Sequence, residues 1–293
     1  MTSFLFKLIF RLLASLPLAW LHGLGTLLGR ITFATSKEYA TRTRENLRRS
    51  NLAGNETDYA NLLAQTIDEA GKGMVELPWV WLRPFEQVCA TVQRCQGWEY
   101  VEAAHARGKG IIFLTPHWGC FEITSLYIAQ HLTLTNLYSS PKQDWLEPLM
   151  RRGRERGKAH LATADLSGVR LLFKALKRGE AIGLLPDQVP SQGEGEWVDF
   201  FSRPAYTMTL SGRLAQSSGA TMLLVYAERL PHGKGYNLNF EQLPLDFTKS
   251  VPQQINTALE RVIAISPAQY LWSYNRYKVP PGVAPPSPGE QTC

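Results

Sequence analysis

The stretch GIIFLTPHWGCFE, residues 110–122, decides the fold. Its first half is a short apolar run that ends at Pro116, and runs of this length are typical of buried strands. Three more apolar runs follow along the chain, at 134–138, 181–185 and 220–226. Segments with helical periodicity alternate with them, at 118–130, 144–156, 168–178 and 207–218. This alternation predicts an α/β domain in which helices flank the sheet.

The same stretch places a histidine at the carboxyl end of a strand, where open α/β sheets bind their ligands. Glu122 follows His117 by five residues. The two side chains would point about 140° apart on an ideal helix, so they can meet only if His117 lies in the turn before the helix, as Pro116 favours. A neutral imidazole can take a proton from a hydroxyl nucleophile, and a carboxylate on its other ring nitrogen fixes its tautomer. This predicts His117 and Glu122 as a catalytic pair. A histidine that caps its own helix is the structural alternative.

The spacing is not specific by itself, because it occurs a second time at His160 and Asp165. His160 follows the basic run RRGRERGKA, and Asp165 with Ser167 is typical of a helix cap. We therefore interpret this second pair as structural.

Other common site motifs are absent from the sequence. It has no P-loop, no dinucleotide-binding GxGxxG, no GxSxG elbow and no HExxH zinc motif. The four cysteines show no regular spacing, so neither a zinc site nor a disulfide framework is indicated, and a reducing compartment fits best. The net charge of +6 favours an anionic partner, which includes membrane surfaces, phosphorylated substrates and nucleic acids.

Residues 1–35 are predicted to be an N-terminal membrane anchor. The cleanest apolar stretch, residues 12–29, is near the lower limit of roughly 17 to 25 residues for a spanning helix, so it either crosses once or lies in the interface. Pro17 would strain a continuous helix. A cleaved signal peptide is disfavoured by the missing small-x-small site and by the basic segment at 37–50. A buried hairpin of core helices remains the alternative.

The rest of the chain divides into a predicted catalytic domain, residues 36–279, and a tail. Residues 58–77 have the periodicity of an amphipathic helix, which the aromatic and proline-containing segment 78–84 is expected to end. Residues 280–293 contain five prolines and are predicted to be disordered.

Ordered motifs along nearly the whole chain resemble those of the lipid A late acyltransferases, the lauroyl and myristoyl transferases that are grouped with the lysophospholipid acyltransferases. Besides the apolar N-terminus, the motifs are R-x-N-L at 44–47, TPHWGCFE at 115–122, GRERG at 153–157, LLPDQ at 184–188, DFFSRPAYT at 199–207 and YLWSYNRYK at 270–278.

This resemblance implies a single mixed-sheet domain of the glycerolipid-acyltransferase kind on the cytoplasmic side of a bacterial inner membrane. The enzyme would take an acyl chain from acyl carrier protein, or from coenzyme A, and pass it to a hydroxyl of a lipid A precursor. It would contact membrane lipids but no nucleic acid. No cofactor or metal is expected, because the thioester is already activated.

The resemblance also assigns roles to residues. It makes His117 the general base and Glu122 its orienting carboxylate. The substrate-binding positions that it implies are Arg154, Arg156, Asp187, Gln188 and Arg276. Two departures from the family pattern, Ser202 and Asn275, bear on recognition of the acceptor.

The residues taken alone leave alternatives open. The two arginines of the GRERG run can grip a phosphate or form a basic helix face. Asp187 belongs either to a site at a strand end or to a turn. Phe200 and Phe201 are better explained by core packing than by an acyl pocket. The oxyanion is expected to bind backbone N–H groups at the start of the helix after His117.

Two kinds of alternative function remain: acyl transfer to another acceptor, and a role without catalysis. The acceptor is alternatively a lysophospholipid, an ornithine lipid or a glycolipid mannoside. A non-catalytic membrane adaptor, whose basic runs bind anionic lipid, is the alternative from a different class.

Overall fold

The computed structural model describes residues 2–286, with side chains from residue 5 onward. The helices are α1 (Thr2–Ser15), α2 (Leu18–Thr35), α3 (Lys37–Arg49), α4 (Glu56–Leu82), α5 (Phe85–Cys89), α6 (Trp98–Ala106), α7 (Phe121–His131), α8 (Glu147–Arg154), α9 (Leu166–Lys177), α10 (Leu210–Ser218) and α11 (Val251–Ile265), with short 3-10 turns η1 (Pro231–Gly233) and η2 (Pro267–Gln269). The strands are β1 (Val92–Gln96), β2 (Ile111–Leu114), β3 (Leu134–Tyr138), β4 (Ala159–Thr163), β5 (Ala181–Leu184), β6 (Gly195–Phe200), β7 (Arg203–Met208), β8 (Thr221–Arg229) and β9 (Tyr236–Gln242).

Seven strands form one sheet in the order β1-β9-β8-β2-β5-β3-β4. All neighbours are parallel except β8 and β9, which form an antiparallel pair. Strands β2 and β5 lie in the middle and every residue of both is buried, which explains their uninterrupted apolar sequences. The prediction of an α/β fold with a mixed sheet flanked by helices is confirmed.

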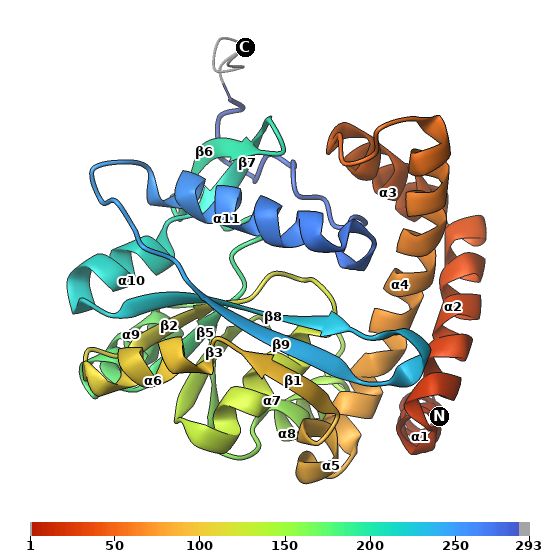
Figure 1. The fold of residues 1–293 in the computed structure, drawn as a ribbon, viewed down its shortest axis with the longest axis horizontal. Coiled ribbons are helices and arrows are strands. Elements are labelled where there is room, and N and C mark those ends of the chain that lie inside the picture. Colours follow the sequence, from red (N-terminus) through yellow and green to blue (C-terminus); the bar gives the residue numbers. More distant parts are fainter. Residues whose placement is uncertain (1, 287–293) are drawn as a thin grey trace.

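Helices cover both faces of the sheet (Figure 1), and a hydrophobic core lies on each face. Alternate residues of β2 supply the two cores: Ile111 and Phe113 pack on one face with α6 and α7, and Ile112 and Leu114 on the other with α9, α10 and α11. The separate β6–β7 hairpin lies beside α11 on this second face. Helix α4 runs along one end of the sheet and contributes side chains to both cores.

The N-terminal segment is two helices rather than one, since the chain breaks at Pro17 between α1 and α2. Helix α2 packs closely on α4 through glycines: a Cβ at Gly71 would lie 2.0 Å from the carbonyl oxygen of Gly25. Within residues 2–286, none of the helices has both the length and the apolar character needed to cross a membrane. The predicted membrane-anchoring helix is therefore not supported.

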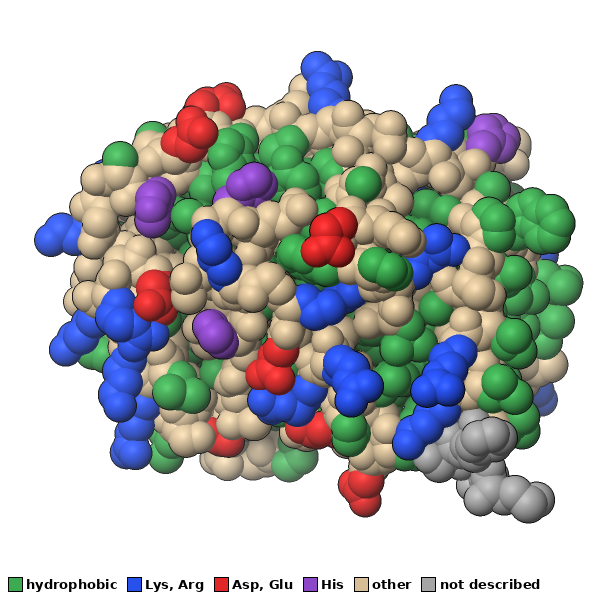
Figure 2. All heavy atoms as spheres, turned by 90° about the horizontal axis from the view of Figure 1, so that it is seen from below, with side chains coloured by type: hydrophobic (Ala, Val, Ile, Leu, Met, Phe, Trp, Pro, Cys, Tyr) green, Lys and Arg blue, Asp and Glu red, His purple; other side chains and the backbone are tan. Residues whose placement is uncertain are grey.

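Hydrophobic side chains nevertheless gather on the outer face of these two helices (Figure 2). The large exposed ones are Leu5, Phe6, Leu8, Ile9, Leu12, Trp20, Leu27 and Ile31, which we call the α1–α2 face. Trp20 is 73% exposed, far more than core packing would allow. The opposite face of the two helices packs against α4, so the segment has one face in the protein and one apolar face toward the outside.

Several predicted boundaries were wrong. Helix α4 continues through Pro78 and ends only at Leu82, two residues before Pro84. The first residues of the predicted helix 207–218 belong to strand β7, because they pair with β6 in a hairpin. At the C-terminus, Trp197 Nε1 donates a hydrogen bond of 2.9 Å to Ala284 O; of the predicted tail, residues 287–293 lie outside the described residues.

Candidate active site

The turn between β2 and α7 carries His117 and is held on every side by backbone hydrogen bonds. The Gly119 and Cys120 amides donate to the carbonyls of Gln269 and Ala227, and the His117 carbonyl accepts from Leu271. Gly119 has a positive φ of 57°, and a Cβ there would lie 1.9 Å from Ala227 O, so only glycine fits. The turn is therefore rigid, which fixes the position of the imidazole.

The imidazole of His117 is oriented by Asp187, which follows strand β5. Its Nδ1 lies 2.8 Å from Asp187 Oδ1, and the His117 backbone amide donates to Asp187 Oδ2, also at 2.8 Å. On the opposite side of the ring, Gln188 Nε2 lies 3.1 Å from His117 Nε2. An amide N–H only donates, so Nε2 is the acceptor and the proton of the neutral ring resides on Nδ1. This is the tautomer that a general base requires.

Asp187 is buried and ionised. Burial raises the pKa of its carboxyl, but His117, followed by the Arg276 charge, lowers it more, so the pKa lies below its usual range. Arg276 is itself buried, and its guanidinium donates to Tyr206 O and Thr207 Oγ1 at 2.8 and 2.6 Å. The arginine thus supports the carboxylate from behind.

Glu122 does not contact the ring of His117 in this structure. Its carboxylate is gripped by Arg154, whose Nε lies 3.0 Å from Oε2 and whose Nη2 also contacts Oε1, and it accepts from Trp81 Nε1 at 3.1 Å. Burial raises the pKa of Glu122, but the charge and hydrogen bonds of Arg154 lower the pKa by more. The carboxylate is therefore also ionised. The predicted orienting contact was therefore wrong, because the Nδ1 position is taken by Asp187. A catalytic role for Glu122 stays a prediction.

Two of the predicted substrate-binding arginines point away from the His117 cavity. Arg156 donates to three backbone carbonyls, those of Gly153, Arg83 and Val80, which ties α8 to the end of α4. Arg276 lies behind Asp187. Neither lines the cavity, whereas Arg154 and Gln188 do. Phe200 and Phe201 are core residues, as the sequence favoured.

The cavity next to His117 has a volume of about 740 Å³. It begins at His117, Glu122 and Arg154 and extends along apolar side chains from β3, β4, β5, α7, α9 and α10. Its size falls within the roughly 300 to 1,000 Å³ of small-molecule sites. Among residues 2–286, no group of His, Cys, Asp and Glu side chains is arranged to hold a metal ion.

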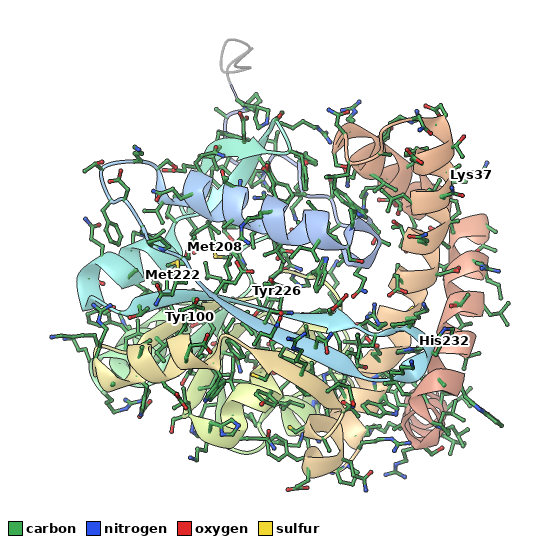
Figure 3. The ribbon with its side chains drawn as sticks, in the orientation of Figure 1. Lys37, Tyr100, Met208, Met222, Tyr226 and His232 are labelled. Carbon is green, nitrogen blue, oxygen red and sulfur yellow. The ribbon has the colours of Figure 1, made fainter. Side chains whose placement is uncertain are left out.

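A buried ionic cluster beneath the turn was missed in the sequence. Arg229, at the end of β8, donates to Glu76 Oε1 and Oε2 at 2.7 and 2.6 Å, to Glu69 Oε2 at 2.6 Å and to Gly119 O at 3.0 Å. His22 Nε2 lies 2.7 Å from Glu76 Oε1. The cluster joins helices α2 and α4 to the turn that carries His117, and the β8–β9 turn that carries His232 packs beside α2 (Figure 3). The residues of each contacting pair are 54 to 160 apart in the sequence, so no local pattern signals the cluster.

The second His-x4-acid pair is structural, as predicted. His160 lies exposed on β4, and Asp165 caps α9 by accepting from the amides of Ser167 and Gly168 at 2.8 and 3.0 Å. The two side chains have separate surroundings, and only Asp165 lies at the cavity wall.

Comparison with known proteins places the chain in a family. The family model described as "Bacterial lipid A biosynthesis acyltransferase" matches residues 1–279. Similar relatives include a lipid A biosynthesis lauroyltransferase of Escherichia coli K12, 27% identical over 94% of this chain and 90% of its own, and a lipid A biosynthesis palmitoleoyltransferase of the same strain, 26% identical over 91% and 87%. A lipid A biosynthesis acyltransferase of Haemophilus influenzae is 27% identical over 60% of this chain and 56% of its own. The chain therefore belongs to the bacterial lipid A biosynthesis acyltransferase family and is an O-acyltransferase.

Proposed function

We propose that this enzyme transfers a fatty acyl chain from acyl carrier protein, or from coenzyme A, to a hydroxyl of a lipid A precursor. One observation carries the proposal: the Nδ1 side of His117 is held by Asp187, while its Nε2 side faces a cavity with long apolar walls. A base at the mouth of such a cavity suits a reaction between a hydroxyl and a hydrocarbon-bearing thioester. The names of the relatives support the choice of acceptor.

The reaction needs one proton to move twice. His117 Nε2 takes the proton of the acceptor hydroxyl while its oxygen attacks the thioester carbonyl carbon, and a tetrahedral oxyanion forms. The C–S bond then breaks, the ester remains on the acceptor, and the leaving thiolate takes the proton back from Nε2. Asp187 stabilises the imidazolium between these steps. Gln188 occupies the hydroxyl's place at Nε2 and must move aside when the acceptor binds.

The oxyanion requires donors that the turn itself does not supply. The amides of residues 117–120 are all engaged, with Asp187, Pro116, Gln269 and Ala227 as acceptors. The next two amides, of Phe121 and Glu122, open helix α7 at the cavity wall, and the first amides of a helix have no partner within it. We assign the oxyanion to these two amides, in a position where a single donor contributes about 3 to 4 kcal/mol in other acyl-transfer sites.

A matched pair of variants tests the proposed function. Purified protein is assayed with acyl carrier protein or coenzyme A loaded with a radiolabelled acyl chain, and with a lipid A precursor, a lysophospholipid or an ornithine lipid as acceptor. We expect ester formation on the lipid A precursor, a loss of at least about 10³-fold in His117→Ala, and turnover close to wild type in His160→Ala. Full activity in His117→Ala would exclude the mechanism, and transfer only to another acceptor would exclude the substrate.

We also propose that the enzyme works at the cytoplasmic surface of the inner membrane, with the α1–α2 face in the lipid interface. The support is the apolar character of this face and the cations Lys7 and Arg11 beside it on α1, a combination typical of interfacial helices. Co-sedimentation with vesicles that contain anionic lipid should fall at least about tenfold in a Leu12→Glu/Trp20→Glu double variant. Ile265→Glu, at an exposed apolar site on α11, serves as the control and should bind like wild type. Undiminished binding of the double variant would place the contact elsewhere.

A further inference from the structure

The cavity beside His117 lies on both faces of the sheet. Side chains of successive residues in a strand point to opposite faces, yet Asn136 and Leu137 of β3 both line the cavity, and so do Gly183 and Leu184 of β5. A space that both members of each pair reach must pass around the carboxyl edge of the sheet, where His117 lies. The cavity therefore has two arms that meet at the imidazole.

The first arm, which we call the α7 arm, lies on the face covered by α7 and α8. Helix α7 contributes Phe121, Thr124, Ser125 and Ile128, which share one helical face at spacings of three and four residues. The opposite wall runs along β3 from Tyr138 back to Leu134, a length of about 13 Å at 3.3 Å per residue.

The far end of the α7 arm is lined by buried apolar side chains. At its far end, Ile128 and Leu134 are each 1% exposed and pack with Phe113 and Leu161 in the core of this face. The polar pair in its wall is satisfied internally, because Asn136 Nδ2 donates to Ser125 Oγ at 2.7 Å. An apolar arm that runs into the core suits a chain that enters tail first and whose reactive carbonyl is its last carbon.

The second arm, which we call the α10 arm, lies on the opposite face between α9 and α10. Helix α10 contributes Leu210, Arg213, Leu214 and Ser217, again at spacings of three and four residues. Here the rim is open: Leu166 is 77% exposed, and Arg213 and Ser217 are exposed as well. Met208, at the end of β7, also lines the cavity and lies between the sheet and α11 (Figure 3).

The α10 arm has the features that a large phosphorylated lipid needs. An open rim lets a chain lie in the arm while its head group remains outside. Arg213 makes no ion pair with the residues between 5 and 286, so its charge is free to meet an anionic head group. A hydroxyl within a chain also requires space for the tail beyond the reacting carbon, which the arm past His117 provides.

We propose that the two arms hold different reactants: the α7 arm measures the acyl chain of the donor, and the α10 arm receives a hydrocarbon chain of the acceptor. This assignment rests on the proposed function and adds to it which arm of the cavity binds which substrate. It places donor chain-length selection on Leu161 and its neighbours, and acceptor binding on Val169 and its neighbours.

Two matched substitutions separate the arms. Leu161 and Val169 are both half-buried at the cavity wall, one in each arm, so tryptophan at either fills its own arm. With a series of acyl carrier proteins loaded from octanoyl to palmitoyl, Leu161→Trp should lower kcat/KM for the longest chains relative to the shortest by about tenfold or more, and should leave the KM for lipid A precursor unchanged. Val169→Trp should raise that KM about tenfold and leave the ranking of donor chains as in wild type. Leu171→Trp, on the exposed outside of α9, should match wild type in both measurements.

Each result decides the assignment. The reverse pattern would overturn it, and so would a single substitution that changed both reactants, or two that changed neither. If the tryptophan variants unfold, as circular dichroism would reveal, phenylalanine at the same positions is measured instead. Failure of the proposed function is a separate outcome, because wild-type protein would then transfer no acyl chain to lipid A precursor from any donor in the series.

Discussion

Two segments of this chain share the spacing of a histidine and an acid five residues later, and they differ in everything else. At 117–122 the histidine lies in a rigid turn that follows a central strand, and its side chain lines the large cavity. At 160–165 the histidine is exposed within edge strand β4, and the acid caps helix α9. Position relative to the sheet, and not the spacing, decides which pair belongs to a site.

The partner of His117 follows the same rule. Asp187 lies 70 residues from His117 in sequence but follows β5, the strand directly beside β2. Carboxyl ends of adjacent parallel strands meet at one edge, so their following residues meet too. Glu122, although nearer in sequence, lies on the helix beyond the turn and pairs with Arg154 instead.

The sharpest way to break this comparison is Asp187→Asn. An amide in place of the carboxylate favours the wrong tautomer of His117 and no longer stabilises the imidazolium, so kcat should fall by about 10³- to 10⁴-fold. Thermal unfolding and kcat are measured together. If kcat stays within about tenfold of wild type, Asp187 is not the orienting carboxylate.

Glu122→Gln should act mainly on stability. It leaves the largely buried Arg154 guanidinium without its counter-charge, which costs about 3 to 5 kcal/mol of unfolding free energy in buried pairs. Denaturant unfolding measures the loss, and an added Arg154→Met substitution should recover part of it. An unchanged stability together with an altered pH profile of kcat would instead indicate that Glu122 acts on His117 during turnover.

The third carboxylate placed by the fold, Glu76, predicts a pH dependence. Burial raises its pKa, but Arg229 and His22 lower it more, and the pKa lies at about 2 instead of 4.5. Because the folded pKa is the lower one, this contribution of about 3 kcal/mol is fully present above pH 4.5 and is lost as the pH falls toward 2. Unfolding free energies measured across this range should show the decline, and Glu76→Gln should show a shallower one. Equal slopes in the two proteins would refute the assignment.

The smallest effect is expected at the second histidine–acid pair, His160 and Asp165. Asp165→Ala removes the cap of α9 and should lower the thermal midpoint by about 1 to 3 °C. Asp165→Asn retains the acceptor oxygen and should restore most of the shift. A loss of turnover as large as that in Asp187→Asn would mean that the second pair is also part of the chemistry.

Much of the fold was predictable, because the central strands are buried on both faces and their sequences are apolar throughout. Strands β1, β4, β6, β7 and β9 were not predicted. Their burial alternates or is partial, so their apolar signal is weak, and their identity depends on neighbours distant in sequence.

The site was predictable in part for the same reason. Local sequence indicated that His117 ends a strand, and the structure bears out that placement. Which carboxylate faces its ring depends on strand order, with β5 beside β2, and this order is a tertiary property. The two arginines of the GRERG run show most clearly what local sequence does not predict. They are two residues apart, yet Arg154 lines the cavity and Arg156 donates its hydrogen bonds to backbone carbonyls.

The cluster around Arg229 changes how the N-terminus should be regarded. A membrane anchor with no role in the fold could be deleted to obtain a more soluble protein. In this structure, however, His22 of α2 contacts the carboxylate of Glu76, which also holds Arg229 beneath the turn that carries His117. Deleting the first 35 residues would remove α1, α2 and His22, and would expose the charges of Glu76 and Arg229 to water. The apolar N-terminal segment therefore helps to hold the turn that carries His117, and shortened variants should be tested for activity as well as for solubility.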